Sequence, residues 1–321
     1  MIGSDRVLVE VAAETTYGSD PGGGSQLTLY NPQLPVQYEA EADLRERAWS
    51  WSGPVEVPNA PGFFRWPTLQ TYLAAGTANN APPSWATLLT ACGFRLTEQS
   101  ADKTEWQGPY DLDGSVTLRG YFGHRKVRTV GVRGTWALNA FAGRPVPLQF
   151  SMAGKYEDSS FAALPSSTAS PGMPPAWCGT AFVLLNAAHA IVTPPIISCS
   201  IDCGMGVAAR RPALTSGAIS AIEWERSGAP RMQTVFEARP TDDWIQVYRA
   251  GTPYYLNFVL THGTGGWFFQ TPDVTGPTAT LGPTPPVWVE QDGIVGWQLE
   301  WTLAPDVSTG AALVIQQYGT G

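Results

Sequence analysis

Apolar and polar residues alternate along many short stretches of this chain, which is the pattern of a β-strand with one buried and one exposed face. The clearest stretch covers residues 295–303, where every odd position is large and apolar: Val295, Trp297, Leu299, Trp301 and Leu303. Similar alternation predicts strands at residues 7–12, 27–30, 115–121, 127–134, 146–152, 197–203, 218–225, 232–238 and 254–260. Because Gly and Pro residues separate these stretches, the sequence predicts a mainly β fold of many short strands.

One segment has a helical period instead. Between Pro83 and Gly93, apolar residues recur at positions i, i+3, i+4 and i+7 and share one face: Trp85, Leu88, Leu89 and Cys92. Ser84 stands where an N-cap is expected, and Gly93 where a helix would end. We expect a short helix that packs its apolar face flat against a sheet.

Five aromatic residues gather in the segment 45–66, among several prolines and without a sustained period: Trp49, Trp51, Phe63, Phe64 and Trp66. Aromatic side chains in an irregular segment either cap the hydrophobic core or form a surface that contacts another molecule. The pattern leaves both interpretations open. We predict that the segment makes contacts between subunits or between stacked rings of subunits.

The two halves of the chain share the pattern W-x6-G-x-P-x2-L-x-F, with five matches at one constant offset of 108 residues. The first copy comprises Trp136, Gly143, Pro145, Leu148 and Phe150, and the second comprises Trp244, Gly251, Pro253, Leu256 and Phe258. In each copy we expect a helical turn that ends at the glycine, followed by a strand whose Leu and Phe point inward. The repeat predicts two similar β units in tandem, at residues 1–156 and 177–321, joined by a Ser-, Ala- and Pro-rich linker or long loop at 157–176.

Composition indicates a folded chain that does not grip nucleic acid. Of the 321 residues, 43% are hydrophobic and 14% are charged, which suits a sizeable core and argues against disorder. The net charge of −8 offers no basic face that could displace counterions from phosphates. The densest basic run alternates with valines, and we interpret it as the wet face of a strand: His124, Arg125, Lys126, Arg128 and Arg133.

The four cysteines are interpreted as structural thiols. Cys199 and Cys203 share the apolar phase of a predicted strand and lie about 13 Å apart along it, too far to share a metal ion. Cys92 and Cys178 are isolated in the sequence.

No stretch reaches the roughly 18 apolar residues of a membrane span, and the charged segment 1–18 lacks the apolar centre of a signal peptide. We therefore expect synthesis in a cytoplasm.

The sequence carries no recognisable catalytic or cofactor motif. The three histidines are far apart, and there is no P-loop, dinucleotide fingerprint or G-x-S-x-G elbow. Two carboxylate pairs are of the kind that a glycosidase uses, but they lie beside turns or a predicted helix start, where Asp is common: Asp111 with Asp113, and Asp242 with Asp243. We predict a non-enzymatic protein without a metal or cofactor.

Several segments together resemble the major tail tube proteins of long-tailed, siphovirus-type phages. They are Glu-Thr-Thr-Tyr-Gly-Ser-Asp-Pro at 14–21, the predicted helix at 83–93, the strand and Gly204-Met-Gly-Val-Ala-Ala-Arg-Arg-Pro within 194–217, and Gly265-Gly-Trp-Phe-Phe-Gln-Thr-Pro-Asp273 followed by Asp292-Gly293 and the long alternating strand. The likeness is spread over most of the chain.

The resemblance implies β-sandwich or barrel units with a flanking helix, which close into rings and stack into a tube in the virion tail. The implied partners are further copies of the chain, a tape-measure protein in the lumen, and terminator and distal tail proteins at the tube ends. DNA would pass through without sequence-specific binding, and no membrane is involved. Relatives with one unit use six copies per ring, so two units per chain predict trimeric, pseudo-hexameric rings, with hexameric rings as the alternative.

Two other functions stay open on the sequence alone. A carbohydrate- or ligand-binding β-sandwich would place exposed tryptophans beside a pocket. A hydrolase would use a pair of Asp or Glu residues. The acidic composition favours the tube, because like charge keeps DNA from adhering to the wall of a lumen.

Overall fold

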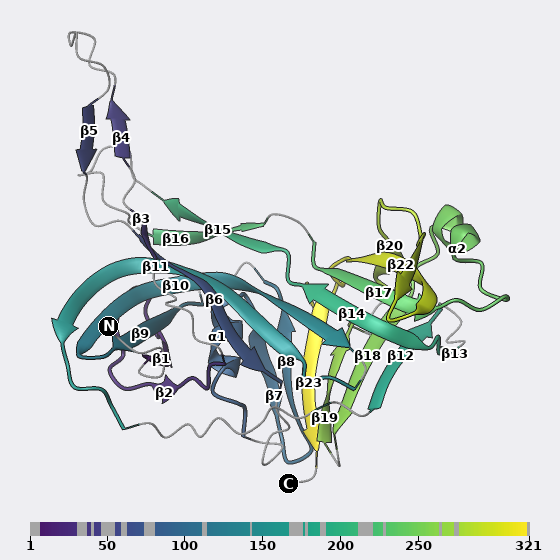
Figure 1. Cartoon of the computed structure of the whole chain (residues 1–321), viewed down its shortest axis with the longest axis horizontal. Coiled ribbons are helices and arrows are strands. Elements are labelled where there is room, and N and C mark those ends of the chain that lie inside the picture. The colour runs from purple at the N-terminus through teal and green to yellow at the C-terminus, as the bar shows by residue number, and fades with distance from the viewer. Residues whose placement is uncertain are drawn as a thin grey trace.

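Strands dominate the protein and form two large antiparallel sheets, which confirms the mainly β prediction (Figure 1). The computed structural model describes residues 7–30, 37–39, 42–45, 55–58, 63–73, 81–110, 114–141, 143–166, 176, 179–186, 191–210, 221–226, 229–262, 265–272 and 276–319. Within these residues there are two short helices, α1 (Ala86–Ala91) and α2 (Trp244–Ala250).

The long sheet contains twelve of the described strands. Its main path runs through β2 (Ser25–Gln26), β1 (Val7–Ala13), β9 (Val116–Phe122), β10 (Arg125–Phe141), β14 (Ile196–Asp202), β17 (Arg231–Glu237), β22 (Ile294–Leu303) and β20 (Ala279–Leu281). Along its other edge, β10 pairs with β11 (Pro147–Phe161), which is followed by β6 (Phe63–Tyr72) and β3 (Gln37–Glu39). The strand β21 (Val287–Gln291) pairs with β22.

The second sheet has seven of the described strands. In spatial order they are β13 (Ile191–Val192), β12 (Gly179–Leu185), β18 (Tyr255–His262), β19 (Gly265–Gln270), β23 (Leu313–Gly319), β8 (Lys103–Gly108) and β7 (Arg95–Gln99). Two hairpins lie outside both sheets: β15 (Met205–Arg210) with β16 (Ala221–Arg226), and β4 (Ala42–Arg45) with β5 (Val55–Pro58). The β4–β5 hairpin stands well away from the body of the protein (Figure 1).

The hydrophobic core lies between the two sheets. The ring of Trp136 in β10 lies 6.3 Å from that of Phe269 in β19, and Phe236 in β17 lies 5.1 Å from Phe182 in β12. The predicted alternation of β22 places four side chains in this core, each at most 5% exposed: Trp297, Leu299, Trp301 and Leu303. Val295 has the same phase but is 52% exposed, because the strand extends past the core at that end.

The predicted helix is present as α1, but it is shorter than the segment 83–93 in which the sequence pattern predicts it. Its N-cap is Trp85 rather than Ser84, and no side chain caps it. The apolar face is confirmed, since all four of its residues are buried: Trp85, Leu88, Leu89 and Cys92. Gly93 follows the helix with a φ of +81°, and a Cβ there would lie 2.8 Å from the Tyr110 carbonyl oxygen, so a glycine is required.

The two copies of the W-x6-G-x-P-x2-L-x-F pattern differ in structure around the tryptophan and are similar in the strand that follows the glycine. In the second copy Trp244 opens α2, and Gly251 ends it in the left-handed conformation, as predicted. In the first copy the predicted helical turn is wrong, because Trp136 lies inside the long strand β10. Gly143 is nevertheless left-handed too, with a φ of +72°. Both copies then bury the Leu and Phe of the following strand: Leu148, Phe150, Leu256 and Phe258.

Both predicted units contribute strands to each large sheet. The strand β10 pairs with β14 from Ala137 to Phe141, which joins the 1–156 part to the 177–321 part. One cluster of buried side chains includes residues of both parts. Within the predicted linker, residues 157–161 continue β11, and 167–175 lie outside the described residues. The division into tandem units stays a prediction.

Two other local predictions are corrected. The predicted strand at 27–30 is irregular: the strand precedes it as β2, while Leu27 N donates to the Val9 carbonyl at 2.8 Å and Tyr30 N to the Gln70 carbonyl at 3.0 Å. Residues 63–66, predicted to be irregular, begin the strand β6. In both places pairing with distant strands decides the backbone conformation, and the local pattern does not report it.

Candidate functional site: the open face of the long sheet

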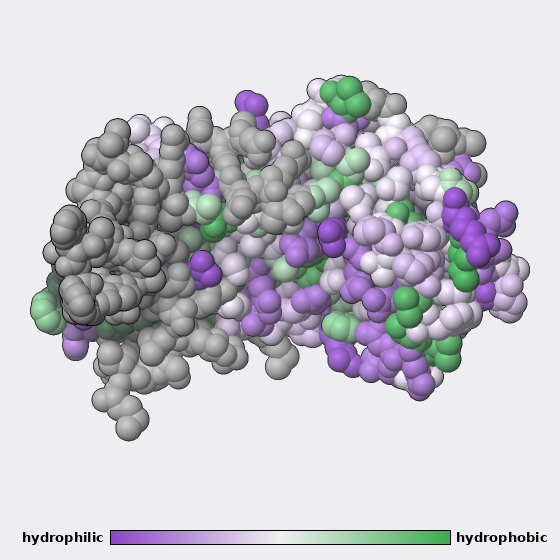
Figure 2. Space-filling view, turned by 90° about the horizontal axis from the view of Figure 1, so that it is seen from above, coloured by the Kyte–Doolittle hydropathy of each residue, from purple (hydrophilic) through white to green (hydrophobic). Residues whose placement is uncertain are grey.

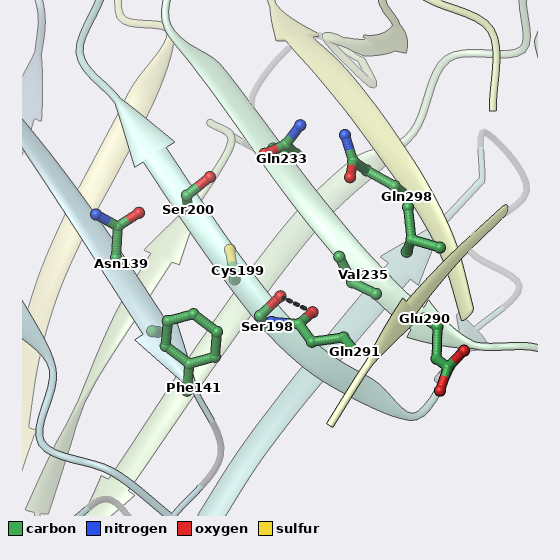
Figure 3. A pocket seen from close by; sticks show the side chains of 12 residues that line it. Asn139, Phe141, Ser198, Cys199, Ser200, Gln233, Val235, Glu290, Gln291 and Gln298 are labelled. Carbon is green, nitrogen blue, oxygen red and sulfur yellow. Dashed lines mark hydrogen bonds between the residues drawn. The ribbon is translucent and has the colours of Figure 1, made fainter. Parts of the chain in front are cut away.

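Four neighbouring strands of the long sheet turn a polar face away from the core. Because side chains alternate along β10, β14, β17 and β22, each strand buries apolar residues and presents its intervening residues outward. The outward residues include amide and hydroxyl side chains together with apolar and charged ones, and several are drawn in Figure 3. We call this surface, together with Gln291 of the adjoining strand β21, the amide face and define it by Asn139, Ser198, Ser200, Gln233, Gln291 and Gln298.

Strand pairing gathers these side chains from distant parts of the sequence. Asn139 lies opposite Ser200, and Ser200 lies opposite Gln233. Two adjoining hollows, with volumes of about 370 and 340 Å³, share these three residues in their walls. A continuous trough therefore crosses the four strands.

The three residues that both hollows share, Asn139, Ser200 and Gln233, carry neutral hydrogen-bonding groups, while the remaining walls also include apolar and charged residues. The Ser198 hydroxyl donates to Gln291 Oε1 at 2.9 Å, as the dashed line in Figure 3 marks. Among the described residues that line the two hollows, Arg231 is the one cation, and its Nη1 lies 3.0 Å from Glu300 Oε1. In the coloured part of Figure 2, which looks down on this side of the molecule, hydrophilic and intermediate residues surround separate apolar groups. The trough suits contact with water or a polar ligand.

The other half of the same sheet is overlaid by the segment 14–22, which includes the motif noted in the sequence. The Glu14 carboxylate accepts four hydrogen bonds, from the Ser115 hydroxyl at 2.6 Å, the Thr117 hydroxyl at 2.7 Å, Gly131 N at 2.8 Å and Gly18 N at 2.7 Å. One carboxylate thus ties the loop to both β9 and β10.

Asp20 holds two arginines of this sheet. Its carboxylate pairs with Arg119, whose side chain is only 4% exposed, and lies 3.1 Å from Arg128 Nη1. Arg128 Nε lies 2.8 Å from Glu157 Oε2 as well. Burial raises the pKa of Asp20, but the hydrogen bond from Arg119 and that from Gly22 N outweigh it, so the pKa is lowered. The loop therefore neutralises the guanidinium groups beneath it.

Tyr17 fastens the β15–β16 hairpin to the long sheet. Its hydroxyl accepts from Ile222 N at 2.5 Å, and Arg133 Nη1 donates to the Ile222 carbonyl at 2.9 Å. The Arg133 guanidinium lies 4.7 Å from the centre of the Tyr17 ring, within reach of a cation–π contact. Gly131 gives this ring its space, since it has a φ of +60° and a Cβ there would lie 2.7 Å from Tyr17 Cζ.

We expect Gly131→Ala to lower the free energy of unfolding by about 2–3 kcal/mol, because it adds a steric clash to a left-handed backbone. Gly143→Ala is the matched control, since Gly143 is equally left-handed but has nothing within 4 Å of its Cβ position. It should lose about 1 kcal/mol, from backbone strain alone. Urea unfolding of both variants measures the difference, and equal losses would show that Tyr17 does not fill this space.

The predicted contact residues are brought together only in part. The contact prediction is corrected for Trp66. Its side chain is fully buried, and its Nε1 donates to the Thr129 hydroxyl at 3.1 Å, so Trp66 is part of the hydrophobic core. Phe64 lies 5.0 Å from Tyr156, measured between ring centres. The remaining side chains of the predicted set lie outside the described part of the chain: Trp49, Trp51 and Phe63.

Of the acidic pair at 242–243, Asp243 is confirmed as a residue of a helix start. Its side chain caps α2 by accepting a hydrogen bond from Gln246 N at 2.9 Å. Three cysteines are buried as predicted, and Cys203 Sγ lies 3.9 Å from the Cys92 carbonyl oxygen.

The prediction that the basic run at 124–133 faces solvent is wrong for Arg133, which is 7% exposed. Several other predicted positions lie outside the described residues: Asp111, Asp113, Cys178 and His189.

The described residues were searched for a metal-binding group and for a helix that could span a membrane. No group of three or more His, Cys, Asp or Glu side chains is arranged to hold a metal ion there. None of the helices in that part of the chain is long and apolar enough to cross a membrane. A scan against protein-family models finds no match for the chain, and a search of curated proteins finds none either.

Sequence reasoning missed the amide face. Four of its members lie at the polar positions of predicted strands, whereas Asn139 and Gln291 lie outside every predicted strand. Each residue is unremarkable alone. The available signal was the kind of polar residue: Asn139, Ser200 and Gln233 are uncharged, whereas the wet face of a surface strand commonly carries Lys, Glu or Thr. Their meeting on one surface depends on strand order, which the periodicity does not give.

Proposed function

We propose that this chain is a structural protein that assembles into stacked rings and forms the tail tube of a long-tailed phage. The observation that carries the proposal is the long sheet. Among the described strands its main path ends at two short strands, β2 on one side and β20 on the other, where Ala279 alone bridges to Tyr254, and it leaves a polar face open. Exposed sheet edges invite pairing with another chain, and closing a ring satisfies every edge at once.

The strand order also supports two units per chain. Of the eight strands in the main path, β2, β1, β9 and β10 precede residue 157, and β14, β17, β22 and β20 follow residue 176. Two sets of four strands, joined where β10 pairs with β14, would make each chain equivalent to two subunits of a sixfold ring. Three chains would then close one ring.

Contacts between rings need parts that reach beyond the body of the subunit. The β4–β5 hairpin projects in this way, and it overlaps the segment 45–66 for which the sequence predicts contacts (Figure 1). We propose that this hairpin joins neighbouring rings. A tape-measure protein would occupy the lumen during assembly, terminator and distal tail proteins would close the ends, and the tube would pass DNA without catalysis.

Negative-stain microscopy of the purified protein is expected to show rings or tubes with a central hole. Helical reconstruction should give three chains per ring, each with two four-strand sets around the lumen. Six identical chains per ring would contradict the two-unit proposal while keeping the tube. A protein that stays monomeric at every concentration and salt condition would contradict the tube itself.

A second function is favoured by one feature of the trough. Its amide and hydroxyl groups, next to the ring of Phe141, could bind the hydroxyl groups and apolar face of a sugar (Figure 3). A carbohydrate-binding module would stay monomeric and bind glycans saturably. Titration of glycans, followed by tryptophan fluorescence, distinguishes it from a tube subunit.

A further inference from the structure

We infer that the amide face lines the channel of the assembled tube and lets a nucleic acid pass along neutral side chains that do not hold its phosphates. The inference rests on the proposed function, since it assumes that a ring forms. It assigns the channel wall to one of the two outer sheet faces of the chain. It also names the residues that form this wall.

The charge of the face is the first reason. Each Lys or Arg that meets a phosphate releases counterions and strengthens binding, so a wall for passage should offer few free cations. Arg231 is paired with Glu300. The trough also includes Asp202 at one end and Glu290 at the other. The wall is therefore neutral at its centre and acidic at its margins.

The chemistry of the amide groups is the second reason. Asn and Gln side chains both donate and accept hydrogen bonds, and Ser does the same through its hydroxyl. Such groups hold a layer of water as readily as they hold a ligand, and they carry no net charge. A polyanion that moves past them exchanges one weak contact for another, so no position along the wall traps it.

The outer face of the second sheet also carries amides, Gln107 and Gln316, but it adds charged pairs and stacked aromatic rings. Lys103 in β8 pairs with Glu98 in β7 at 2.6 Å and with Glu105 in β8 at 3.0 Å. The rings of Phe268 and Tyr318 stack on this face with centres 4.6 Å apart. Aromatic and paired charged groups suit contacts with other proteins better than a wall for DNA. We place this face on the outside of the tube.

Cysteine accessibility in assembled tubes tests the assignment. Ser200→Cys marks the amide face with a nearly isosteric change, and Gln316→Cys marks the outer face of the second sheet. Both variants carry Cys178→Ser, and the described native thiols are buried: Cys92, Cys199 and Cys203. Burial also raises the pKa of each of these thiols, which keeps them unreactive. Each variant is treated with a small maleimide and with a maleimide carried on a large polymer, before and after assembly into long tubes.

The inference expects both variants to react fully with both reagents before assembly. In tubes, the Ser200→Cys thiol should still take the small maleimide, because the channel is filled with water, but its labelling by the polymer reagent should fall at least tenfold. The Gln316→Cys thiol should keep taking both reagents.

Two outcomes overturn the assignment while the tube stands. If the Ser200→Cys thiol takes the polymer reagent in tubes, the amide face is on the outside. If it loses reaction even with the small maleimide, the face is buried between chains. If no rings or tubes form, the proposed function fails, and the channel wall fails with it; microscopy of the same samples tells these cases apart.

Discussion

Replacing Trp301 with Ala is expected to lower the free energy of unfolding by about 3–5 kcal/mol, the range for removing a large buried aromatic side chain. Trp301 is fully buried in β22, and its ring packs edge-on against Trp244 at 6.4 Å and Tyr254 at 6.0 Å between centres. Its Nε1 also donates to the Thr234 hydroxyl at 3.0 Å. The substitution removes both packing and a buried hydrogen bond, and denaturant unfolding measures the loss.

Two variants separate these contributions. Trp301→Phe keeps most of the packing but leaves the buried Thr234 hydroxyl without its donor, so an intermediate loss of about 1–3 kcal/mol is expected. Trp288→Ala is the control, because Trp288 lies on the paired strand β21 and is 56% exposed. It should change stability by less than about 1 kcal/mol. Similar losses for Trp301→Ala and Trp288→Ala would contradict the position of Trp301 in the core.

Replacing Asp20 with Asn should cost about 3 kcal/mol, the low end of the range for breaking a buried ion pair from one side. The loss comes from Arg119, which stays buried without its carboxylate partner. Asp102→Asn is the matched control, since Asp102 is an exposed acid in a turn. The double variant Asp20→Asn with Arg119→Met should recover part of the loss, because no charge is then stranded. Unfolding in urea near neutral pH provides the measurement.

The same pair predicts a pH dependence. The pKa of Asp20 is lower in the folded protein than in the unfolded chain, where it is about 3.9. Its contribution is therefore fully present above the unfolded pKa and is lost as the pH falls through the lower, folded pKa. Wild-type protein should lose this part of its stability in acid, and Asp20→Asn should not. Parallel pH profiles for the two proteins would rule out a stabilising role for this carboxylate.

Predictions from the sequence succeeded where one local pattern sufficed. The alternation in 295–303 located β22, and the i, i+3, i+4, i+7 spacing located the buried face of α1. Gly251 ended α2 as expected, because a glycine in the left-handed conformation commonly terminates a helix. These features depend on neighbours within a few residues, so the sequence contains them directly.

Predictions failed where a distant partner decided the outcome. Trp136 shares its pattern with Trp244, yet it lies in a strand, because β10 is held between β11 on one edge and β9 and β14 on the other. Trp66 belongs to the segment that the sequence predicts to make contacts, yet its indole donates to the Thr129 hydroxyl in the core. Arg133 looked exposed, yet its guanidinium donates to two carbonyl groups.

The sequence by itself determined the class of the fold and the inward phase of most strands, because a strand needs only an alternating pattern and one apolar face to bury. It also determined the acidic balance that argues against gripping DNA. Only the tertiary structure decided which strands are neighbours. That order sets Asn139 beside Ser200 and Ser200 beside Gln233, and it sets Asp20 against Arg119. The reason is physical: hydrogen bonds between strands join residues with no local relation in the chain, so the surface that they form exists only after pairing.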